Sequence, residues 1–280
     1  MEILRELRKP PVTGHPAPHQ AGTPILEASQ LSVRFETGWV LENVSFRVDT
    51  GERVAVVGPN GAGKSTLFKA IAGILNPAGG KINIAGQGPG GHICIAYLPQ
   101  RSQVDWTFPV SVADVVMMGR IGKLGLLRWP KRKDWEIVLR SLDVVGMSAL
   151  ANRQIGELSG GQQQRMFIAR ALAQEAELML MDEPLTGLDI GSQEAIFEIL
   201  EELNRRDVTV LVSTHDLDQA AGRFDRVMLL NRRLLGFGRP AEVFTPQRLL
   251  EAYGGHLRLV QTESELLAVS DTCCDEGEAR

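Results

Sequence analysis

The sequence predicts an α/β protein with a doubly wound parallel sheet at its core, an antiparallel β region before that core and a mainly helical insert within it. Short alternating apolar stretches fill residues 25–48, which is typical of antiparallel strands. From residue 53 onward, short apolar strands alternate with amphipathic helices, the pattern of a parallel sheet covered on both faces. Residues 101–157 interrupt this alternation with helical patterns and no strand pattern.

The N-terminal part of the chain divides into an arm and two strands. Residues 1–24 are rich in Pro, Gly and His and show no periodicity, so they predict a flexible arm. The stretches 25–35 and 40–48, broken by Thr37-Gly38, predict two antiparallel strands.

The first strand of the parallel sheet is predicted at residues 53–57, which are almost all apolar. It runs into a glycine-rich turn and then into a helix expected over residues 64–75. We expect Asn76-Pro77 to end this helix, because proline cannot continue it.

The second half of the core follows the helical insert, in which helices are expected at residues 112–118 and 135–145. A strand at 178–182, a helix at 192–204 and a strand at 208–213 restore the strand-helix alternation. Two further short apolar stretches, at 226–230 and 234–237, predict a closing hairpin.

The C-terminal end of the domain is marked by one more helix. Thr245 is its expected cap, Pro246 its first residue and Gly254 its end. Residues 262–280 turn acidic and small, which predicts a flexible tail. With no internal repeat, residues 25–261 are predicted to form a single domain.

Composition restricts the possible functions. The formal net charge of −4 gives no indication of a nucleic-acid partner. The longest apolar runs, such as residues 178–181, are far shorter than the roughly 20 residues that span a bilayer. Cys94, Cys273 and Cys274 do not have the spacing of a disulfide framework, and no signal sequence follows residues 1–9, so a cytoplasmic protein is expected.

A glycine-rich segment between the strand at 53–57 and the following helix fits the pattern G-x-x-x-x-G-K-[ST]. Its glycines allow backbone N–H groups to converge on phosphates, and Lys64 places a point charge on the β and γ oxygens. Ser65 is the expected Mg²⁺ ligand. The candidate ATP-binding residues of this segment are Gly58, Pro59, Asn60, Gly61, Ala62, Gly63, Lys64, Ser65 and Thr66.

Two carboxylates end the apolar strand at 178–182. Asp182 can hold Mg²⁺ through water, and Glu183 can orient or deprotonate an attacking water. Together with the phosphate loop they predict a nucleoside-triphosphate-hydrolysing site, with Glu183 as a catalytic residue.

The segment Leu158-Ser-Gly-Gly-Gln162 distinguishes among phosphate-loop enzymes, because it resembles the signature of ABC ATPases. Ser159 is expected to cap a helix, and Gly160 and Gly161 expose N–H groups that can meet a phosphate. The resemblance covers about residues 25–255. It implies a P-loop NTPase fold of the ABC cassette type, with a RecA-like parallel-sheet core, an N-terminal antiparallel β subdomain and an α-helical subdomain at about 101–157.

The resemblance also assigns further residues to the site. Gln100 is similar to the glutamine that senses Mg²⁺ and the membrane partner, and His215 to the switch histidine at the γ-phosphate. Asp189 resembles the residue that communicates across a dimer. In the family, each ATP lies between the phosphate loop of one chain and the signature residues of a second copy, here Ser159, Gly160, Gly161 and Gln162.

Adenine stacking is the least determined part of the site. The residue aligned with the family's stacking aromatic is Phe35, and stacking needs only a ring face. Trp39 is close enough in sequence to compete, so both remain candidates.

A narrower resemblance concerns the transported cargo. Residues 97–109 and 114–120 resemble cassettes of manganese, zinc or iron importers. The resemblance implies an ATP-binding and ATP-hydrolysing subunit at the cytoplasmic face of the membrane, which works with an integral membrane permease and, indirectly, an extracytoplasmic solute-binding protein. The helical insert would contact the permease. Four of its aromatic residues are either anchors of that contact or core residues: Trp106, Phe108, Trp129 and Trp135.

Three alternatives stay open. An importer of iron chelates or cobalamin uses closely similar cassettes, and the pairs Asp105-Trp106 and Phe108-Pro109 favour free metal ions over it. A non-transport ABC ATPase usually carries coiled-coil or zinc insertions, or two cassettes in one chain, and none of these is evident in the sequence. The third alternative is an accessory ATPase of cluster assembly. In every case ATP and Mg²⁺ are the expected cofactors.

Overall fold

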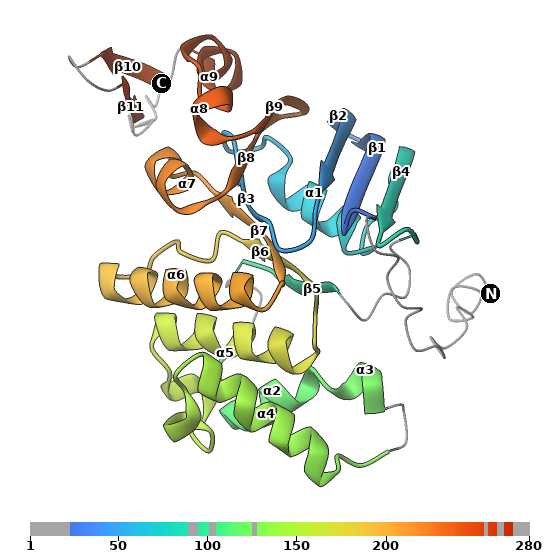
Figure 1. Cartoon of the computed structure of the whole chain (residues 1–280), viewed down its shortest axis with the longest axis vertical. Coiled ribbons are helices and arrows are strands. Elements are labelled where there is room, and N and C mark those ends of the chain that lie inside the picture. Colours follow the sequence, from blue (N-terminus) through green and yellow to red (C-terminus); the bar gives the residue numbers. More distant parts are fainter. Residues whose placement is uncertain are drawn as a thin grey trace, which may run out of the picture.

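The computed structural model describes residues 23–88, 95–100, 105–124, 128–254, 257–261 and 266–270. A central sheet with strand order β5-β6-β7-β3-β8-β9 lies in the middle of the molecule (Figure 1). Its first five strands are parallel, and β8 and β9 form the antiparallel hairpin expected from the sequence. Its strands are β3 (Arg53–Val57), β5 (Ile95–Leu98), β6 (Leu178–Asp182), β7 (Thr209–Thr214), β8 (Arg226–Asn231) and β9 (Arg233–Gly238).

A separate antiparallel sheet has the order β2-β1-β4. It consists of β1 (Leu26–Phe35), β2 (Gly38–Val48) and β4 (Gly79–Ile84). The first two strands confirm the sequence prediction. Strands β4 and β5 were not predicted, because they flank a glycine-rich stretch that interrupts their apolar pattern.

The helices are α1 (Lys64–Ile71), α2 (Val112–Met118), α3 (Ile121–Leu124), α4 (Arg132–Val144), α5 (Gly160–Ala173), α6 (Ile190–Arg205), α7 (Leu217–Arg223), α8 (Pro240–Val243) and α9 (Pro246–Tyr253). Short 3₁₀ turns lie at Ser148–Leu150 and Ile155–Glu157. The described part of the insert is helical, as expected, and α4 begins three residues before the predicted start. The short helices α7 and α8 were not predicted from the sequence.

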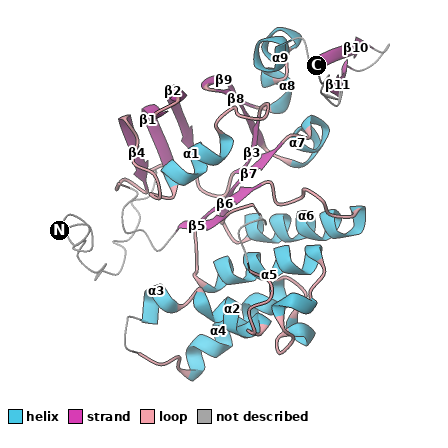
Figure 2. Ribbon diagram, turned by 180° about the vertical axis from the view of Figure 1, so that it is seen from behind, coloured by secondary structure: helices cyan, strands magenta, loops and turns pink. Residues whose placement is uncertain are grey.

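The two faces of the central sheet carry different layers, because side chains alternate along each strand. In β3, Val54 and Val56 pack in one core with α1 and the antiparallel sheet. Ala55 and Val57 pack in a second core with residues of α2, α4, α5 and α6. Figure 2 shows the same division from behind, with α1 on one side of the sheet and α5 and α6 on the other. The helix after the phosphate loop and the helix after the signature segment therefore cover opposite faces.

Helix α1 ends four residues earlier than expected. Gly73 adopts a left-handed φ of 70°, and its N–H donates to the carbonyl of Ala70. The N–H of Ile74 donates to the carbonyl of Lys69, which completes a Schellman motif. Gly73 thus ends the helix before Asn76-Pro77 is reached.

The C-terminal helix confirms the sequence prediction. Thr245 caps α9 by accepting from the N–H of Arg248, Pro246 is its first residue, and Gly254 follows its last. No helix in the described residues is both long and apolar enough to cross a membrane.

Within the tail expected from residue 262, residues 266–270 form a strand that the sequence pattern did not predict. There β11 (Leu266–Ser270) pairs antiparallel with β10 (Leu257–Gln261), because two short apolar stretches can satisfy their backbone groups by pairing. Residues 262–265 and 271–280, which include Cys273 and Cys274, lie outside the described residues, as do Cys94 and residues 1–22 of the expected arm.

Candidate active site

The loop between β3 and α1 is shaped by its glycines. Gly58, Gly61 and Gly63 have φ angles of 156°, 79° and 99°. A Cβ atom at Gly58 would lie 2.0 Å from the carbonyl oxygen of Leu230, and one at Gly63 would lie 2.6 Å from Cδ2 of Leu41. The loop is thus wedged between β8 and β2, and larger residues at these two positions would displace it.

The N-terminus of α1 is suited to an anion. Its N-cap residue, Gly63, provides no side-chain cap, and the first turn holds no acidic residue. The first N–H groups of a helix have no partner within the helix and carry the positive end of its dipole. This end of α1, with the glycine loop before it, fits the phosphate chain of a nucleotide.

Lys64 lies folded over the loop. Its Nζ donates to the carbonyl oxygens of Gly58 at 2.7 Å and Pro59 at 3.2 Å. Burial lowers the pKa of Lys64, while the charges of Glu183 and Asp182 act in the opposite direction. The lysine and the two carboxylates therefore belong to one electrostatic cluster.

Asp182 is buried at the end of β6, next to β7 and β5. Ser213 Oγ donates to Asp182 Oδ1 at 2.6 Å, and the Tyr97 hydroxyl donates to Oδ2 at 3.4 Å. Burial, followed by the Asp182 charge, raises the pKa of Tyr97 to about 12. Asp182 is thus fixed from both neighbouring strands.

Glu183 has a left-handed backbone, with a φ of 48°. Its N–H donates to Ser213 Oγ at 2.9 Å. Its Oε2 accepts from Gln100 Nε2 at 3.1 Å and, at 3.5 Å, from Thr186 Oγ1. Two residues expected at the site, Gln100 and Glu183, are therefore in direct contact although 83 residues separate them.

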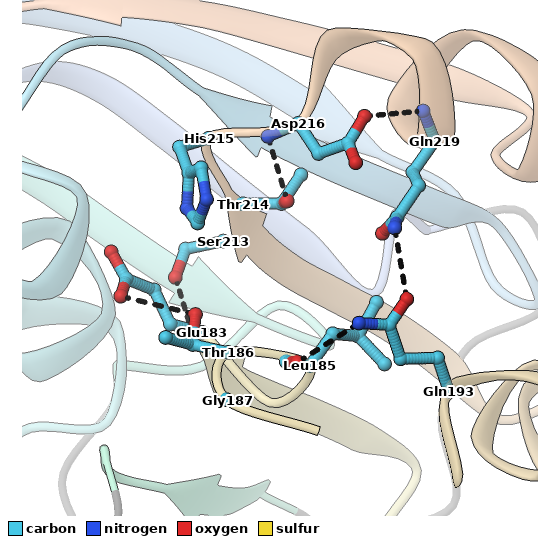
Figure 3. A pocket seen from close by; sticks show the side chains of 10 residues that line it. All are labelled: Glu183, Leu185, Thr186, Gly187, Gln193, Ser213, Thr214, His215, Asp216 and Gln219. Atoms are coloured by element: carbon cyan, nitrogen blue, oxygen red, sulfur yellow. Dashed lines mark hydrogen bonds between the residues drawn. The ribbon is translucent and has the colours of Figure 1, made fainter. Parts of the chain in front are cut away.

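A cavity of about 160 Å³ adjoins these carboxylates and is lined by both Glu183 and His215. Figure 3 shows their side chains on the same side of it. On the other side, Gln219 donates to Gln193 at 3.1 Å, and Gln193 donates to the carbonyl of Leu188 at 3.1 Å. This pair connects α7, which follows His215, to the segment before Asp189.

Asp189 caps α6. Its carboxylate accepts from the N–H of Ser192 at 2.9 Å and from the Ser192 hydroxyl at 2.7 Å, and the hydroxyl is the leading cause of its lowered pKa. A Cβ atom at Gly161 would lie 2.4 Å from Ser192 Oγ. Within one chain, Ser192 thus lies between Asp189 and the signature helix.

Ser159 and Gln162 form the capping box of α5. The N–H of Gln162 donates to Ser159 Oγ at 3.4 Å, and the N–H of Ser159 donates to Gln162 Oε1 at 3.0 Å. The expected cap is confirmed. Because α5 and α1 cover opposite faces of the sheet, the chain brings Gln100, Lys64, Asp182 and Glu183 together without the signature residues.

The two adenine candidates, Phe35 and Trp39, have different strand neighbours. Phe35 follows the buried residues Leu31 and Val33 on the face of β1 that packs toward α1. A bulge in β2 pairs Trp39 with Arg34, whose guanidinium carbon lies 5.4 Å from the Trp39 ring centroid. The two rings are about equally exposed, and a cation lies over one face of the Trp39 ring.

Four polar residues of this site were not predicted as site residues from the sequence: Tyr97, Gln193, Ser213 and Gln219. Ser213 had a detectable signal, because it pairs with Asp182 across the parallel strands β6 and β7. Polar residues at the carboxyl ends of adjacent parallel strands meet at one edge of the sheet. Gln193 and Gln219 lie within helices and had no comparable signal.

The arrangement recognises a phosphate chain through backbone groups and one lysine, with carboxylates beside it. These features define a phosphate-loop nucleoside triphosphatase. The family described as "ABC transporter" matches residues 41–186, which include the phosphate loop, the signature and the acid pair. The chain belongs to this family. It is an ATP-binding subunit that hydrolyses ATP, and the hydrolysis is coupled to transport.

Known proteins of similar sequence support this family assignment. The manganese transport system ATP-binding protein MntB of Halalkalibacterium halodurans is 42% identical over 252 residues, which cover 88% of this chain and 99% of that protein. The chelated iron transport system membrane protein YfeB of Yersinia pestis is 44% identical over 249 residues, 87% of this chain and 84% of that protein. A solved structure described as an inward-facing conformation of a putative metal-chelate type ABC transporter is 30% identical, with a TM-score of 0.75, and the match covers 88% of this chain and 96% of that one.

Proposed function

We propose that this chain binds MgATP, forms a dimer with a second copy of itself around the nucleotide, and drives a permease that imports a transition-metal ion: manganese, zinc or iron. The contact of Gln100 with Glu183 beside the Lys64 loop carries the catalytic part of the proposal. It joins the side chain expected to sense the membrane partner to the carboxylate expected to act on water.

The residue roles follow from their chemistry. Backbone N–H groups of residues 58–66 and the Lys64 ammonium hold the phosphates, and Phe35 stacks on adenine. Glu183 orients or deprotonates the attacking water, and His215 contacts the γ-phosphate. The protein's contribution is positioning and charge stabilisation.

Mg²⁺ is proposed to bind only together with ATP. Among the described residues no group of three or more His, Cys, Asp or Glu could hold a metal ion. Ser65, Gln100 and Asp182 supply oxygen donors beside the loop, the type that Mg²⁺ prefers when phosphates complete its ligands. The bound ion would neutralise charge that develops on the phosphates.

The dimer is supported by the separation of the two phosphate-binding helix ends. The Lys64 loop begins α1, Ser159 begins α5, and these helices cover opposite faces of the sheet. A second copy can present its Ser159 to the first copy's nucleotide, and Asp189 lies beside the same signature helix. Two equivalent ATP sites in a symmetric dimer result.

The permease is proposed to contact the helical part of the chain from the cytoplasmic face of the membrane. Phe108 and Trp129 are exposed there, Trp129 to 88% of its surface, and Trp135 is partly exposed. Trp106 instead packs edge-on against Phe167, with ring centroids 5.8 Å apart. Three of the four aromatic candidates are thus available for an interface. An extracytoplasmic solute-binding protein would act only through the permease.

The cargo assignment rests on the resemblance of residues 97–109 and 114–120 to metal-ion cassettes. Relatives named for manganese and for chelated iron are similarly identical to this chain, so an importer of iron chelates stays the nearest alternative. Measuring manganese, zinc and iron in metal-limited source cells, with and without the chain, tests the assignment. A selective fall in one metal identifies the cargo, and unchanged contents of all three contradict it.

Replacing Glu183 tests the catalytic assignment. We expect Glu183→Gln to bind ATP normally, to accumulate as an ATP-bound dimer and to lose nearly all hydrolysis, because an amide cannot act as a base. ATP hydrolysis and size-exclusion chromatography with ATP measure these effects. The exposed Glu198→Gln, on α6, is the matched control and should behave like the original chain. Normal turnover of Glu183→Gln would refute the assignment.

A further inference from the structure

A buried hydroxyl connects the carboxylate of Asp182 to the backbone N–H of Glu183. Ser213, at the end of β7, has no exposed surface. Its Oγ donates its only proton to Asp182 Oδ1 at 2.6 Å and accepts the N–H of Glu183 at 2.9 Å. Both bonds use the same oxygen, so they fix the carboxylate of one residue relative to the backbone of the next.

Glu183 needs such a fixed backbone. Its φ of 48° lies in the left-handed region, which residues with a Cβ atom adopt only when their surroundings hold them there. Two other left-handed residues of this chain, Gln30 and Asn43, also donate their N–H to a serine hydroxyl, that of Ser45 and Ser32 respectively. The chain thus uses the same contact elsewhere to hold this conformation.

The direction of the Glu183 side chain depends on its backbone conformation. In the left-handed form, Glu183 Oε2 reaches Gln100 Nε2 at 3.1 Å. Without the bond to Ser213, a Glu183 backbone that relaxed to negative φ would turn this carboxylate away from Gln100. Figure 3 shows Ser213 beside Glu183, two residues before His215 on the same strand end.

We propose that Ser213 is a positioning residue for ATP hydrolysis, which aligns the metal-holding Asp182 with the water-activating Glu183. The inference rests on the proposed roles of these two carboxylates and assigns no contact between Ser213 and substrate. It predicts a defect in turnover and in the Mg²⁺ requirement, with little change in ATP affinity, because the Ser213 hydroxyl bonds to Asp182 and Glu183 and not to the side chain of Lys64.

The test compares four variants of the full-length chain. Ser213→Ala removes the hydroxyl, and Ser213→Thr retains it. Thr209→Val is the matched control, since Thr209 is equally buried at the other end of β7 and its hydroxyl also accepts one backbone N–H, that of Gly51, at 2.9 Å. Glu183→Gln reports on the proposed function itself. The measurements are kcat and KM for ATP, the Mg²⁺ concentration for half-maximal rate, and melting temperature.

We expect Ser213→Ala to lower kcat about 10- to 100-fold, since small displacements of a catalytic group have effects of this order. Its Mg²⁺ requirement should rise several-fold, and its KM for ATP should stay within about twofold. Ser213→Thr should recover most of the turnover, and Thr209→Val should stay near the original rate.

Two outcomes would overturn the inference. One is a Ser213→Ala variant whose kcat and Mg²⁺ requirement match those of Thr209→Val. The other is a Ser213→Thr variant that melts like the original chain yet is as inactive as Ser213→Ala. A different result, full turnover in Glu183→Gln, would instead contradict the proposed role of Glu183, so the two failures are distinguishable.

Discussion

Lys64 illustrates how surroundings set the behaviour of one side chain. Burial lowers its pKa, and the charges of Glu183 and Asp182 only partly offset this effect. Binding of anionic phosphates favours the protonated ammonium, so the pKa must be higher in the ATP complex than in the free chain. Between these two values, ATP binding takes up a proton.

The pH dependence of ATP affinity follows from this difference. Affinity should be full below the pKa of the free lysine and should fall as the pH rises through it. Calorimetry at alkaline pH, in buffers of different ionisation enthalpy, measures the proton uptake. Lys64→Arg should bind without this uptake because a guanidinium stays charged. Equal proton uptake in both chains would show that another group titrates.

The adenine contact gives a second prediction at the scale of residues. Phe35→Ala should weaken ATP binding by about 1–3 kcal/mol, the usual contribution of an aromatic ring stacked on a base. Trp39→Ala should change it little, because the Arg34 guanidinium already lies over one face of the Trp39 ring. Fluorescent-nucleotide titration compares them. A larger loss in Trp39→Ala would reverse the assignment.

At the scale of elements, local capping signals explain which boundaries could be predicted. Helix α2 starts where the Ser111–Asp114 capping box begins, and α9 starts at Thr245-Pro246. Helix α1 ends before the expected residue because the N–H groups of Gly73 and Ile74 already bond its last carbonyls in a Schellman motif. A glycine within an amphipathic pattern gives no sign in sequence of which conformation it adopts.

An ionic cluster around Arg120 connects the helices of the helical part. Its ion pairs were not predicted from the sequence. Arg120 is buried and bonds to Asp134 at 3.3 Å, to Glu175 at 2.6 Å and to the carbonyl of Ala173 at 2.9 Å. It thereby joins the segment after α2, the first turn of α4 and the end of α5.

Replacing Arg120 should lower the free energy of unfolding. Arg120→Met leaves the nearly buried Asp134 without its cation and should destabilise the chain by about 3 kcal/mol in urea unfolding. The double variant Arg120→Met/Asp134→Leu should recover much of the loss. Arg132→Met, which breaks an exposed pair with Glu136, is the control and should cost less than about 1 kcal/mol. Equal effects of the two single variants would refute the role of the cluster.

At the scale of the whole molecule, the opposite placement of α1 and α5 predicts complementation between inactive chains. Lys64→Ala disables the phosphate loop, and Ser159→Arg disables the signature helix. A mixed dimer still contains one intact site, formed by Lys64 of one chain and Ser159 of the other. Each variant alone should be inactive, and an equimolar mixture should regain about a quarter of the ATPase activity if chains pair at random.

The matched control is a mixture of Lys64→Ala with the double variant Lys64→Ala/Ser159→Arg. No pairing of these chains contains an intact loop, so this mixture should stay inactive. If the first mixture also showed no more activity than its separate components, the shared-site dimer would be contradicted.

The class of fold and the local chemistry can be recognised in the sequence alone. The Gly58–Lys64 pattern, the Asp182-Glu183 pair and the cap at Ser159 are contiguous motifs, whose backbone requirements are local and can therefore be recognised in one dimension. The order of the longer strands and helices followed from apolar periodicity, and the structure confirms it; the short elements α3, α7, α8, β4, β5, β10 and β11 were not predicted.

Which distant residues meet is set by the three-dimensional fold. Strand order places β7 between β6 and β3, which brings the Ser213 hydroxyl to the Asp182 carboxylate and to the backbone N–H of Glu183. It also places β5 beside β6, which brings Gln100 to Glu183. The β2 bulge pairs Trp39 with Arg34, and alternation along β3 puts helices α1 and α5 on opposite faces of the sheet. Such contacts depend on the pairing and register of strands far apart in the chain, which no local pattern specifies.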